Sequence, residues 1–143
     1  MTIATVLPGF AFIDTNVWLY ALITGQDPLK AQRARTVVAQ TPSIVVSTQV
    51  INEVCVNLIK RERFTPAQVR DIINDFYATY TVIELDQAVL LTATTLLSRY
   101  SLSYWDSLIV ASALTSGAAA LYSEDMQDGL IVDQRLPILN PFK

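Results

Sequence analysis

The sequence predicts an α/β fold, a three-layer α/β/α sandwich around a mainly parallel central sheet. Short segments that are apolar throughout alternate with helical patterns of ten or more residues, as expected for strands buried on both faces and connected by helices. The chain has 143 residues and 52% of them are apolar, so it can bury a core without disulfides or structural metals. We therefore expect a single domain over residues 1–143.

The expected strands are short runs rich in apolar and β-branched residues. They cover residues 10–13, 43–47, 80–85 and 118–123, with shorter strands at 130–132 and 137–139. In a parallel sheet, ligands bind beyond the carboxyl ends of the strands. The residues that follow each strand are therefore the first candidates for a functional site.

The expected helices combine apolar periodicity with capping residues at their ends. They cover residues 17–23, 29–40, 48–61, 66–77, 87–100 and 104–116. An N-cap followed by a proline in the first turn is a strong start signal, and Ser or Thr three residues before an acid forms a capping-box pattern. These signals are Asp27-Pro28, Thr65-Pro66, Asp86 and Ser103 with Asp106, and Gly117 ends the last helix.

The absence of histidine is the most restrictive feature of the composition. It excludes Ser-His-Asp and Cys-His nucleophiles, histidine general bases and every zinc site with an imidazole ligand. The single cysteine, Cys55, excludes an all-cysteine zinc site and an intramolecular disulfide. Any chemistry must therefore come from carboxylates, hydroxyls, amides, Lys, Arg and a hard cation bound by oxygen.

Charge and hydropathy limit the surroundings in which the chain works. The unpaired Cys55 and the lack of a charged-then-apolar signal segment indicate the reducing cytoplasm. The longest weakly polar run, 107–122, is too short for the roughly 20 apolar residues that span a bilayer. Ten Lys and Arg against 13 Asp and Glu give a net charge of −3, which argues against nucleic-acid binding through a broad basic surface.

Four acidic residues lie near the ends of expected strands or the starts of expected helices, namely Asp14, Glu53, Asp106 and Asp125. Three of them have ordinary structural interpretations: an N-cap for Asp14, a capping box for Asp106 and a turn for Asp125. Glu53 lies among apolar residues on a largely buried helix, so it should be paired or bound to a cation. Asn57 follows it by one turn on the same side.

If the strand order brings these four carboxylates together, they need a compensating positive charge. Two carboxylates roughly 4 Å apart repel by about 4 kcal/mol at an effective dielectric constant of 20, so four of them could not all stay ionised alone. Oxygen ligands without His or Cys select Mg²⁺ or Mn²⁺, which keep several waters. The pattern thus predicts a divalent metal site.

Five segments resemble the PIN-domain ribonucleases, most closely the stand-alone VapC-type toxins of prokaryotic toxin–antitoxin pairs. These segments are FIDTNV near the N-terminus, INEV, YWDSLIVASA, LYSEDMQDG and a closing NPF. The resemblance spans nearly the whole chain and depends on four acids in order within similar flanking sequence. It implies a central parallel sheet sandwiched by helices, in agreement with the fold inferred from the pattern alone.

The resemblance implies an endoribonuclease that depends on Mg²⁺ or Mn²⁺ and leaves 5′-phosphate and 3′-hydroxyl ends. Its catalytic and metal-binding acids fall on Asp14, Glu53, Asp106 and Asp125, and we expect Asp14 and Asp106 to be direct ligands. The family's targets include tRNA, ribosomal RNA and messenger RNA. The resemblance also implies a homodimer and a small antitoxin that covers the active site, whereas one metal ion and two are both compatible with it.

Further residues follow from the same resemblance. Asn16 and Ser123 match the polar residue after the first acid and the hydroxyl before the last, with Ser in place of the common Thr. We expect them to hold carboxylates or water by hydrogen bonds, with local turn bonding as an equal alternative. The role of Asp128 stays open. Basic residues suited to RNA phosphates are Lys60, Arg61, Arg63 and Arg99.

The aromatic pair Tyr104 and Trp105 adjoins Asp106 and has two interpretations. An aromatic side chain beside an acidic site can stack on a nucleic-acid base. Aromatic residues next to an apolar helix more often belong to the core or to a dimer interface, and we expect that here.

Two other functions fit parts of the pattern. A receiver-type phosphoacceptor domain also places acids around Mg²⁺, but it needs paired acids after the first strand and a Lys near the last. Here Thr15 and Asn16 follow Asp14, and no Lys lies between Lys60 and Lys143. A non-catalytic PIN-fold binding module would have lost one or more acids, and all four are present.

Overall fold

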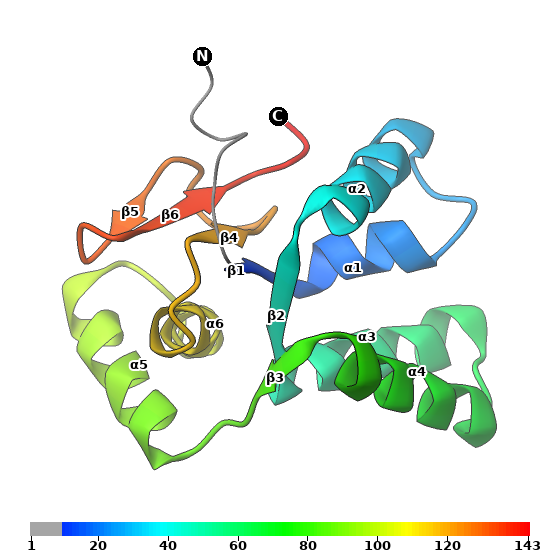
Figure 1. Cartoon of the computed structure of the whole chain (residues 1–143), viewed down its shortest axis with the longest axis horizontal. Helices are drawn as coiled ribbons and strands as arrows, with labels where there is room; N and C mark the ends of the chain where they lie inside the picture. The colour runs from blue at the N-terminus through cyan, green and yellow to red at the C-terminus, as the bar shows by residue number, and fades with distance from the viewer. Residues whose placement is uncertain (1–9) are drawn as a thin grey trace.

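The computed structural model describes residues 10–143 and has the expected α/β organisation (Figure 1). Residues 1–9, where a signal segment would begin, lie outside the described residues. The strands are β1 (Phe10–Ile13), β2 (Ser43–Ser47), β3 (Thr81–Ile83), β4 (Ala120–Tyr122), β5 (Ile131–Val132) and β6 (Leu136–Leu139). The helices are α1 (Thr15–Leu22), α2 (Pro28–Gln40), α3 (Thr48–Glu62), α4 (Pro66–Thr79), α5 (Gln87–Arg99) and α6 (Tyr104–Thr115).

The sheet has six strands in the order β3-β2-β1-β4-β6-β5. All neighbouring pairs are parallel except β5 and β6, so the expectation of a mainly parallel sheet is confirmed. The chain steps outward from β1 to β2 and β3 and then returns to the other side of β1 with β4. The carboxyl ends of β2, β1 and β4 therefore lie side by side at the centre, where such a reversal opens a ligand-binding crevice.

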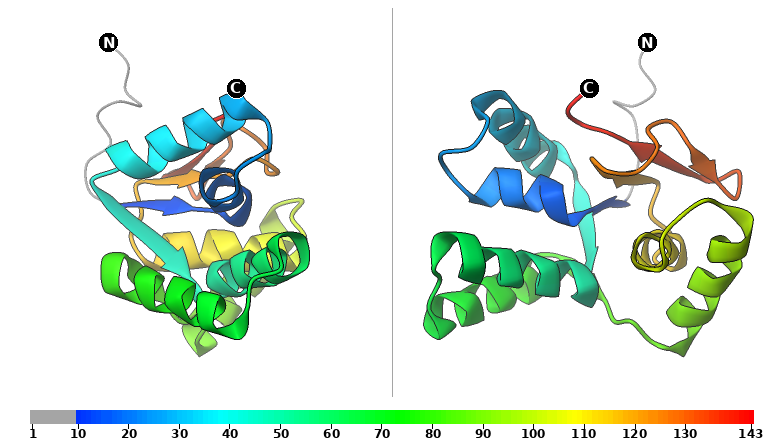
Figure 2. Two further views of the ribbon diagram at one scale, coloured as in Figure 1. Left: turned by 90° about the vertical axis from the view of Figure 1, so that its right-hand side faces the viewer. Right: turned by 180° about the vertical axis from the view of Figure 1, so that it is seen from behind.

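Helices cover both faces of the sheet, which gives the three expected layers. Figure 2 (left) shows α2 above the strands and α4 and α6 below them. Helix α1 continues from β1 and contacts both α2 and α3 (Figure 1), and α5 packs against α6. The central strands are apolar on both faces because both faces are covered; Phe12, Val45 and Leu121 are fully buried.

Most of the expected caps are formed. The Asp27 carboxylate accepts hydrogen bonds from the N–H groups of Leu29 and Lys30, and Pro28 opens α2. At α6, Ser103 Oγ accepts the Asp106 N–H at 3.0 Å. The reciprocal pair of bonds that defines a capping box is formed at α4 instead, between Thr65 and Gln68. The Asp106 side chain lines a pocket instead, so our capping-box assignment is corrected to a simple N-cap.

Two strands are shorter than the apolar runs that predict them. The run at 80–85 pairs only over β3, an edge strand whose side chains are exposed or half-buried. The run at 118–123 pairs only over β4, because the Ala118 N–H instead bonds the Ala113 carbonyl and closes the end of α6. Gly117, at φ +77°, allows this left-handed turn. Among residues 10–143, no helix is both long and apolar enough to cross a bilayer.

Candidate active site: an acidic pocket at the carboxyl edge

The four acids singled out in the sequence line one pocket of about 290 Å³ at the carboxyl edge of the sheet. Asp14 directly follows β1, Glu53 lies in the second turn of α3 after β2, and Asp125 follows β4. Because β2, β1 and β4 are neighbours, their carboxyl ends deliver these three side chains to one place. The pocket is completed by Thr15, Asn16, Gln49, Asn57, Trp105 and Ile109.

Asp106 reaches the pocket by a different route from the other three acids. It lies in the first turn of α6, which precedes β4 rather than following a strand. A helix that leads into a strand of a parallel sheet runs back across the sheet, so its N-terminus lies at the carboxyl edge. The first turn of α6 also favours an ionised Asp106 through the helix dipole.

Asp14 combines a structural role with a place in the pocket. Its carboxylate caps α1 by accepting the Thr15 N–H at 2.7 Å, and its own N–H bonds the Tyr122 carbonyl at 3.0 Å. The parallel register of β1 and β4 places Ser123 beside it, and the buried Ser123 Oγ donates to Asp14 Oδ2 at 2.9 Å. Asp14 therefore can act as the N-cap of α1 and as an acid of the pocket at the same time.

The acids influence one another's ionisation. Burial raises the pKa of the Asp14 carboxyl from 3.8 to about 6, opposed by the bonds from Thr15 and Ser123 and reinforced by the charges of Glu53 and Asp106. Burial also raises the pKa of Asp106, and the neighbouring charge of Asp125 adds to this effect. A pocket that disfavours its own negative charges in this way favours a bound cation.

Glu53 is held by two residues that the sequence analysis did not assign. Thr15 Oγ1 donates to Glu53 Oε1 at 2.5 Å, and Gln49 Nε2 donates to Glu53 Oε2 at 3.3 Å. Gln49 precedes Glu53 by four residues, so helix periodicity was a usable signal for it. The Thr15 contact joins α1 to α3 and could not be found without the strand order. Gln49 Oε1 is buried and has no hydrogen-bond partner among residues 10–143.

The amide side chains of the pocket bond acids or backbone. Asn16 Nδ2 donates to Asp125 Oδ2 at 2.8 Å, a contact across 109 positions rather than a local turn. Asn57 lines the pocket and also bonds the Glu53 carbonyl at 2.9 Å. Asp128 is not part of the pocket lining: its carboxylate accepts the Asn140 N–H at 2.7 Å and fixes the C-terminal segment.

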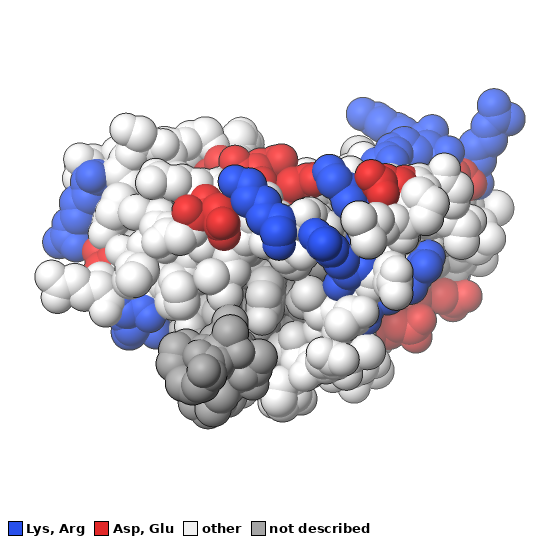
Figure 3. All heavy atoms as spheres, turned by 90° about the horizontal axis from the view of Figure 1, so that it is seen from above, with Lys and Arg blue, Asp and Glu red and all other residues white. Residues whose placement is uncertain are grey.

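The four candidate phosphate-binding residues are exposed, but two of them already have protein partners. Arg61 donates to Gln26 Oε1 at 2.7 Å, and Arg99 forms an ion pair of 3.1 Å with Asp133. Lys60 lies at the end of α3, and Arg63 is its left-handed C-cap at φ 55°. Figure 3 shows basic and acidic side chains intermixed over one face of the molecule, which agrees with the small net charge.

Arg99 lies beside a second cavity that adjoins the acidic pocket. This cavity has about 300 Å³, and Asp106 and Asp125 belong to the lining of both hollows. Tyr100 also lines it, and the Tyr100 hydroxyl bonds Asp133 at 3.2 Å. The two acids therefore separate two adjoining hollows.

Tyr104 and Trp105 were expected in the core or in a dimer interface; the core alternative is wrong, and the dimer interface stays a prediction. Trp105 is 63% exposed and Tyr104 is 41% exposed, because α6 places them in its first turn, outside the packed sheet. Their rings contact each other edge to face at 5.7 Å. Trp105 forms part of the wall of the acidic pocket. Cys55, in contrast, is buried as expected.

The residues of the pocket fit Mg²⁺ or Mn²⁺ bound partly through water. The four carboxylates form an oxygen-only donor set, the type that hard cations select. Within residues 10–143, no group of three or more Asp, Glu, Cys or His side chains is placed to hold a metal directly. Mg²⁺ commonly uses one or two carboxylates and several waters. The donor set therefore suits an open, hydrated site rather than a closed cage.

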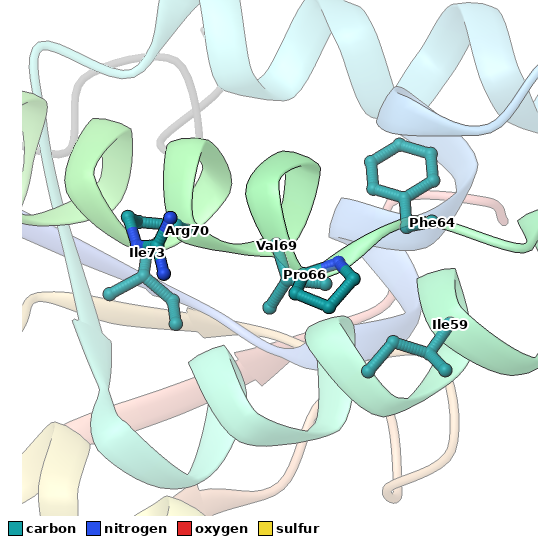
Figure 4. A pocket seen from close by; sticks show the side chains of 6 residues that line it. All are labelled: Ile59, Phe64, Pro66, Val69, Arg70 and Ile73. Atoms are coloured by element: carbon teal, nitrogen blue, oxygen red, sulfur yellow. The ribbon is translucent and has the colours of Figure 1, made fainter.

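A larger cavity lies elsewhere and has a different character. The groove between α3 and α4, about 460 Å³, is shown in Figure 4. Its lining is apolar apart from one arginine and consists of Ile59, Phe64, Pro66, Val69, Arg70 and Ile73. No carboxylate among residues 10–143 lines this groove. The size of a cavity alone therefore does not show which cavity carries out catalysis.

Comparison with known proteins gives one family and several related structures. The family model described as PIN domain matches residues 11–127, whereas none of the curated proteins matches the sequence.

A toxin–antitoxin complex from Klebsiella pneumoniae superposes with a TM-score of 0.69 at 20% identity, covering 92% of this chain and 97% of that one. VapC20 of Mycobacterium tuberculosis, described as a sarcin–ricin loop cleaving toxin, gives 0.63 at 19% identity over 78% and 86%. VapBC2 of Rickettsia felis, bound to promoter DNA, gives 0.63 at 16% identity over 92% and 100%. At these identities the likeness shows the fold.

Proposed function

The chain belongs to the PIN domain family, and from this premise we propose that it is a metal-dependent endoribonuclease and the toxin of a toxin–antitoxin pair. The observation that carries the proposal is the convergence of Asp14, Glu53, Asp106 and Asp125 on one pocket. The absence of histidine from the sequence leaves carboxylates and a hard cation as the means of hydrolysis. The toxin–antitoxin complexes among the related structures support the second part.

In this proposal the four acids divide the work of hydrolysis. Asp14 and Asp106 would hold Mg²⁺ or Mn²⁺ directly, and the ion would supply an activated water and offset charge on the phosphate. Glu53 and Asp125 would bind the ion through water or orient the attacking water. Cleavage would leave 5′-phosphate and 3′-hydroxyl ends. The number of ions is a matter for titration.

Hydrogen bonds from neighbouring residues keep the acids in place. Ser123 and Thr15 donate to Asp14 and Glu53, and Asn16 donates to Asp125. Both oxygens of Asp14 and both oxygens of Glu53 accept a hydrogen bond from the protein, so each carboxylate is held in one orientation. These three residues are positioning residues that act through the acids, not catalytic residues.

The decisive experiment is RNA cleavage by the purified chain in Mn²⁺ buffer, compared with Asp106→Asn. We expect cleavage by the wild type, its loss in Asp106→Asn and its loss on addition of EDTA. Asp128→Asn is the matched control, because Asp128 lies in the same chain region as Asp125 but bonds Asn140, and an asparagine can keep that bond. Full activity of a folded Asp106→Asn variant would contradict the proposal.

The same experiment separates a non-catalytic binding module from the nuclease. A module that only binds RNA would retain RNA in a gel-shift or filter-binding assay without producing new ends in Mg²⁺ or Mn²⁺. Sequencing 5′-monophosphate ends after brief expression would identify the target RNA of an active enzyme.

We propose that the antitoxin covers the acidic pocket with its tail and that another of its segments binds the apolar groove between α3 and α4. A segment with apolar side chains and acidic neighbours fits it, because Arg70 lines the groove and Lys60, Arg61 and Arg63 lie in the same stretch of chain as Ile59 and Phe64. Val69→Asp should release the product of the neighbouring reading frame on co-expression while RNA cleavage is retained. Co-purification at the wild-type level would contradict this assignment.

We also propose that the chain forms a homodimer. Helix α5 leaves Leu90, Leu91 and Leu97 substantially exposed, and a second copy of the chain would bury them. Light scattering across a concentration series tests it, and a monomer mass throughout would contradict it.

A further inference from the structure

Trp105 is the most exposed of the large apolar side chains within residues 10–143 and lies beside the acidic pocket. It is 63% exposed, yet it is directly followed by Asp106 and forms part of the pocket wall. A tryptophan left this open loses the hydrophobic gain of burial, which is large for an indole ring. A ligand with a flat apolar face would cover the exposed indole of Trp105.

The backbone of Trp105 is fixed relative to the acids. Gln49 Nε2 donates both to the Trp105 carbonyl at 3.2 Å and to Glu53 Oε2 at 3.3 Å, so one buried side chain joins the wall to an acid. On the other side, the Ser103 cap holds the first turn of α6. The indole is thus presented from a rigid base, as a binding platform requires.

We propose that Trp105 stacks on an unpaired base of the RNA next to the phosphate that the acids address. This inference rests on the proposed nuclease function and adds a substrate-binding residue to it. Stacking suits an indole that is open to solvent on one side of a polar pocket, and it accepts any base because every base has a π face. It also requires a single-stranded or looped substrate, whose bases are free.

The cavity next to the acidic pocket gives room for an RNA strand that extends to both sides of the acids. Asp106 and Asp125 lie between the hollow bounded by Trp105 and the hollow bounded by Arg99 and Tyr100. A phosphate at the acids would thus have room for one neighbouring nucleotide against Trp105 and for another toward Arg99. A protein partner needs no such continuation across the acids, which favours RNA as the occupant.

The sequence offers a direct spectroscopic test, because it contains only two tryptophans. Trp18 is 3% exposed, donates its Nε1–H to the Ile13 carbonyl at 3.0 Å and packs against Phe76. A change of fluorescence on adding RNA therefore reports on Trp105. In an Asp14→Asn background with Mn²⁺, where cleavage is blocked, oligouridylate and oligoadenylate should each quench the emission and protect it from acrylamide. The change should vanish in Asp14→Asn/Trp105→Phe.

Kinetics of the otherwise unaltered chain give a second readout. Trp105→Leu keeps an apolar side chain but removes stacking, so KM for single-stranded RNA should rise roughly 5- to 150-fold, the equivalent of about 1–3 kcal/mol per stacked base. At saturating RNA, kcat should stay close to the wild type, and Trp105→Phe should recover most of the KM. Leu29→Ala, an equally open apolar position on α2, is the matched control.

The outcomes separate this inference from the proposed function. Wild-type KM in Trp105→Leu together with RNA-independent fluorescence would overturn it even if the enzyme cleaves RNA. Quenching that depends on protein concentration alone would overturn it in favour of a second copy as the occupant. Saturable quenching by RNA in a chain that never cleaves would support the Trp105 platform while contradicting the nuclease.

Discussion

The two ends of β1 and β2 differ in the residues that line the hollow beside them. At the carboxyl edge, the pocket beyond β1 and β2 is lined by four carboxylates. At the amino edge, a hollow of about 400 Å³ before β1, β2 and β3 is lined without any charged residue among residues 10–143. The amino-edge hollow is the larger of the two. The location of the active site in this fold is therefore indicated by the carboxyl ends of the strands and by the metal-binding side chains there, not by the volume of a cavity.

Substitutions at the two edges should differ most in RNA cleavage. Asp14→Asn should lower kcat/KM by about a thousandfold or more, beyond the 10- to 100-fold that groups behind a metal ligand contribute. Asparagine can still cap α1, so the fold should survive. Ser43→Ala, at the exposed start of β2 on the amino edge, should keep wild-type activity. If both variants lost the same fraction of kcat/KM, the prediction that only the carboxyl edge takes part in catalysis would be contradicted.

The free energy of unfolding should depend on pH through the buried carboxyl group of Asp14 at the carboxyl edge, and this effect can be measured without RNA. Because the pKa of Asp14 is 3.8 unfolded and about 6 folded, the folded state retains a proton that the unfolded state releases between these values. The contribution of Asp14 to the free energy of unfolding is thus fully present below pH 3.8 and is lost as the pH rises through 6. At 1.36 kcal/mol per pKa unit the loss is about 3 kcal/mol.

Urea unfolding in EDTA from pH 4 to pH 7.5 measures this effect. Asp14→Asn should be more stable than the wild type at pH 7.5 and nearly equal to it at pH 4, since asparagine does not ionise. Asp106 has a pKa raised in the same direction and adds to the trend. A wild type that gains stability over this range relative to Asp14→Asn would contradict the burial of the Asp14 charge.

Divalent metal should stabilise the molecule through one edge only. When free Mg²⁺ or Mn²⁺ reaches a hundred times its Kd, the free energy of unfolding should rise by about 2.7 kcal/mol. Asp106→Asn should lose most of this gain, and Ser43→Ala should retain all of it. Calorimetric melting with metal and with EDTA makes the comparison, and identical curves would argue against a shared cation site.

Much of the carboxyl edge could be predicted from the sequence because its signals are local. The apolar run before Asp14 and the caps at Asp27 and Thr65 each depend on a few neighbouring residues, and the structure has the corresponding elements. The parallel sheet followed from strands that are apolar on both faces. Glu53 could be singled out because it is an acid among apolar residues in the sequence of its helix.

The remaining features depend on contacts between distant parts of the chain. Nothing local distinguishes Asp125 from Asp128, yet the first lines the pocket and the second bonds the Asn140 N–H. The contact between Thr15 and Glu53 requires β1 and β2 to be neighbours, which a sequence pattern does not specify. The exposure of Trp105 depends on where α6 starts relative to the sheet, and the core alternative, which rested on the average burial of aromatic residues, was wrong.

The smallest expected effect concerns a hydroxyl at each edge. Ser123→Ala removes the bond of 2.9 Å to Asp14 from a fully buried position, so the carboxylate loses one fixed orientation and its pKa rises further. We expect about a tenfold loss of kcat/KM, the lower end of the range for groups that support a metal ligand, and a shift of the acidic limb of the pH profile to higher pH.

The matched change at the other edge is again Ser43→Ala, because both substitutions delete one hydroxyl from a strand end and only one of them faces an acid. If Ser123→Ala and Ser43→Ala had the same kcat/KM and the same pH profile, the Ser123 hydroxyl would be a packing feature of β4. A tenfold difference with a shifted profile would instead mean that the acids depend on a buried donor supplied by the neighbouring strand. The difference between the two edges would then extend from the charged side chains to the groups that orient them.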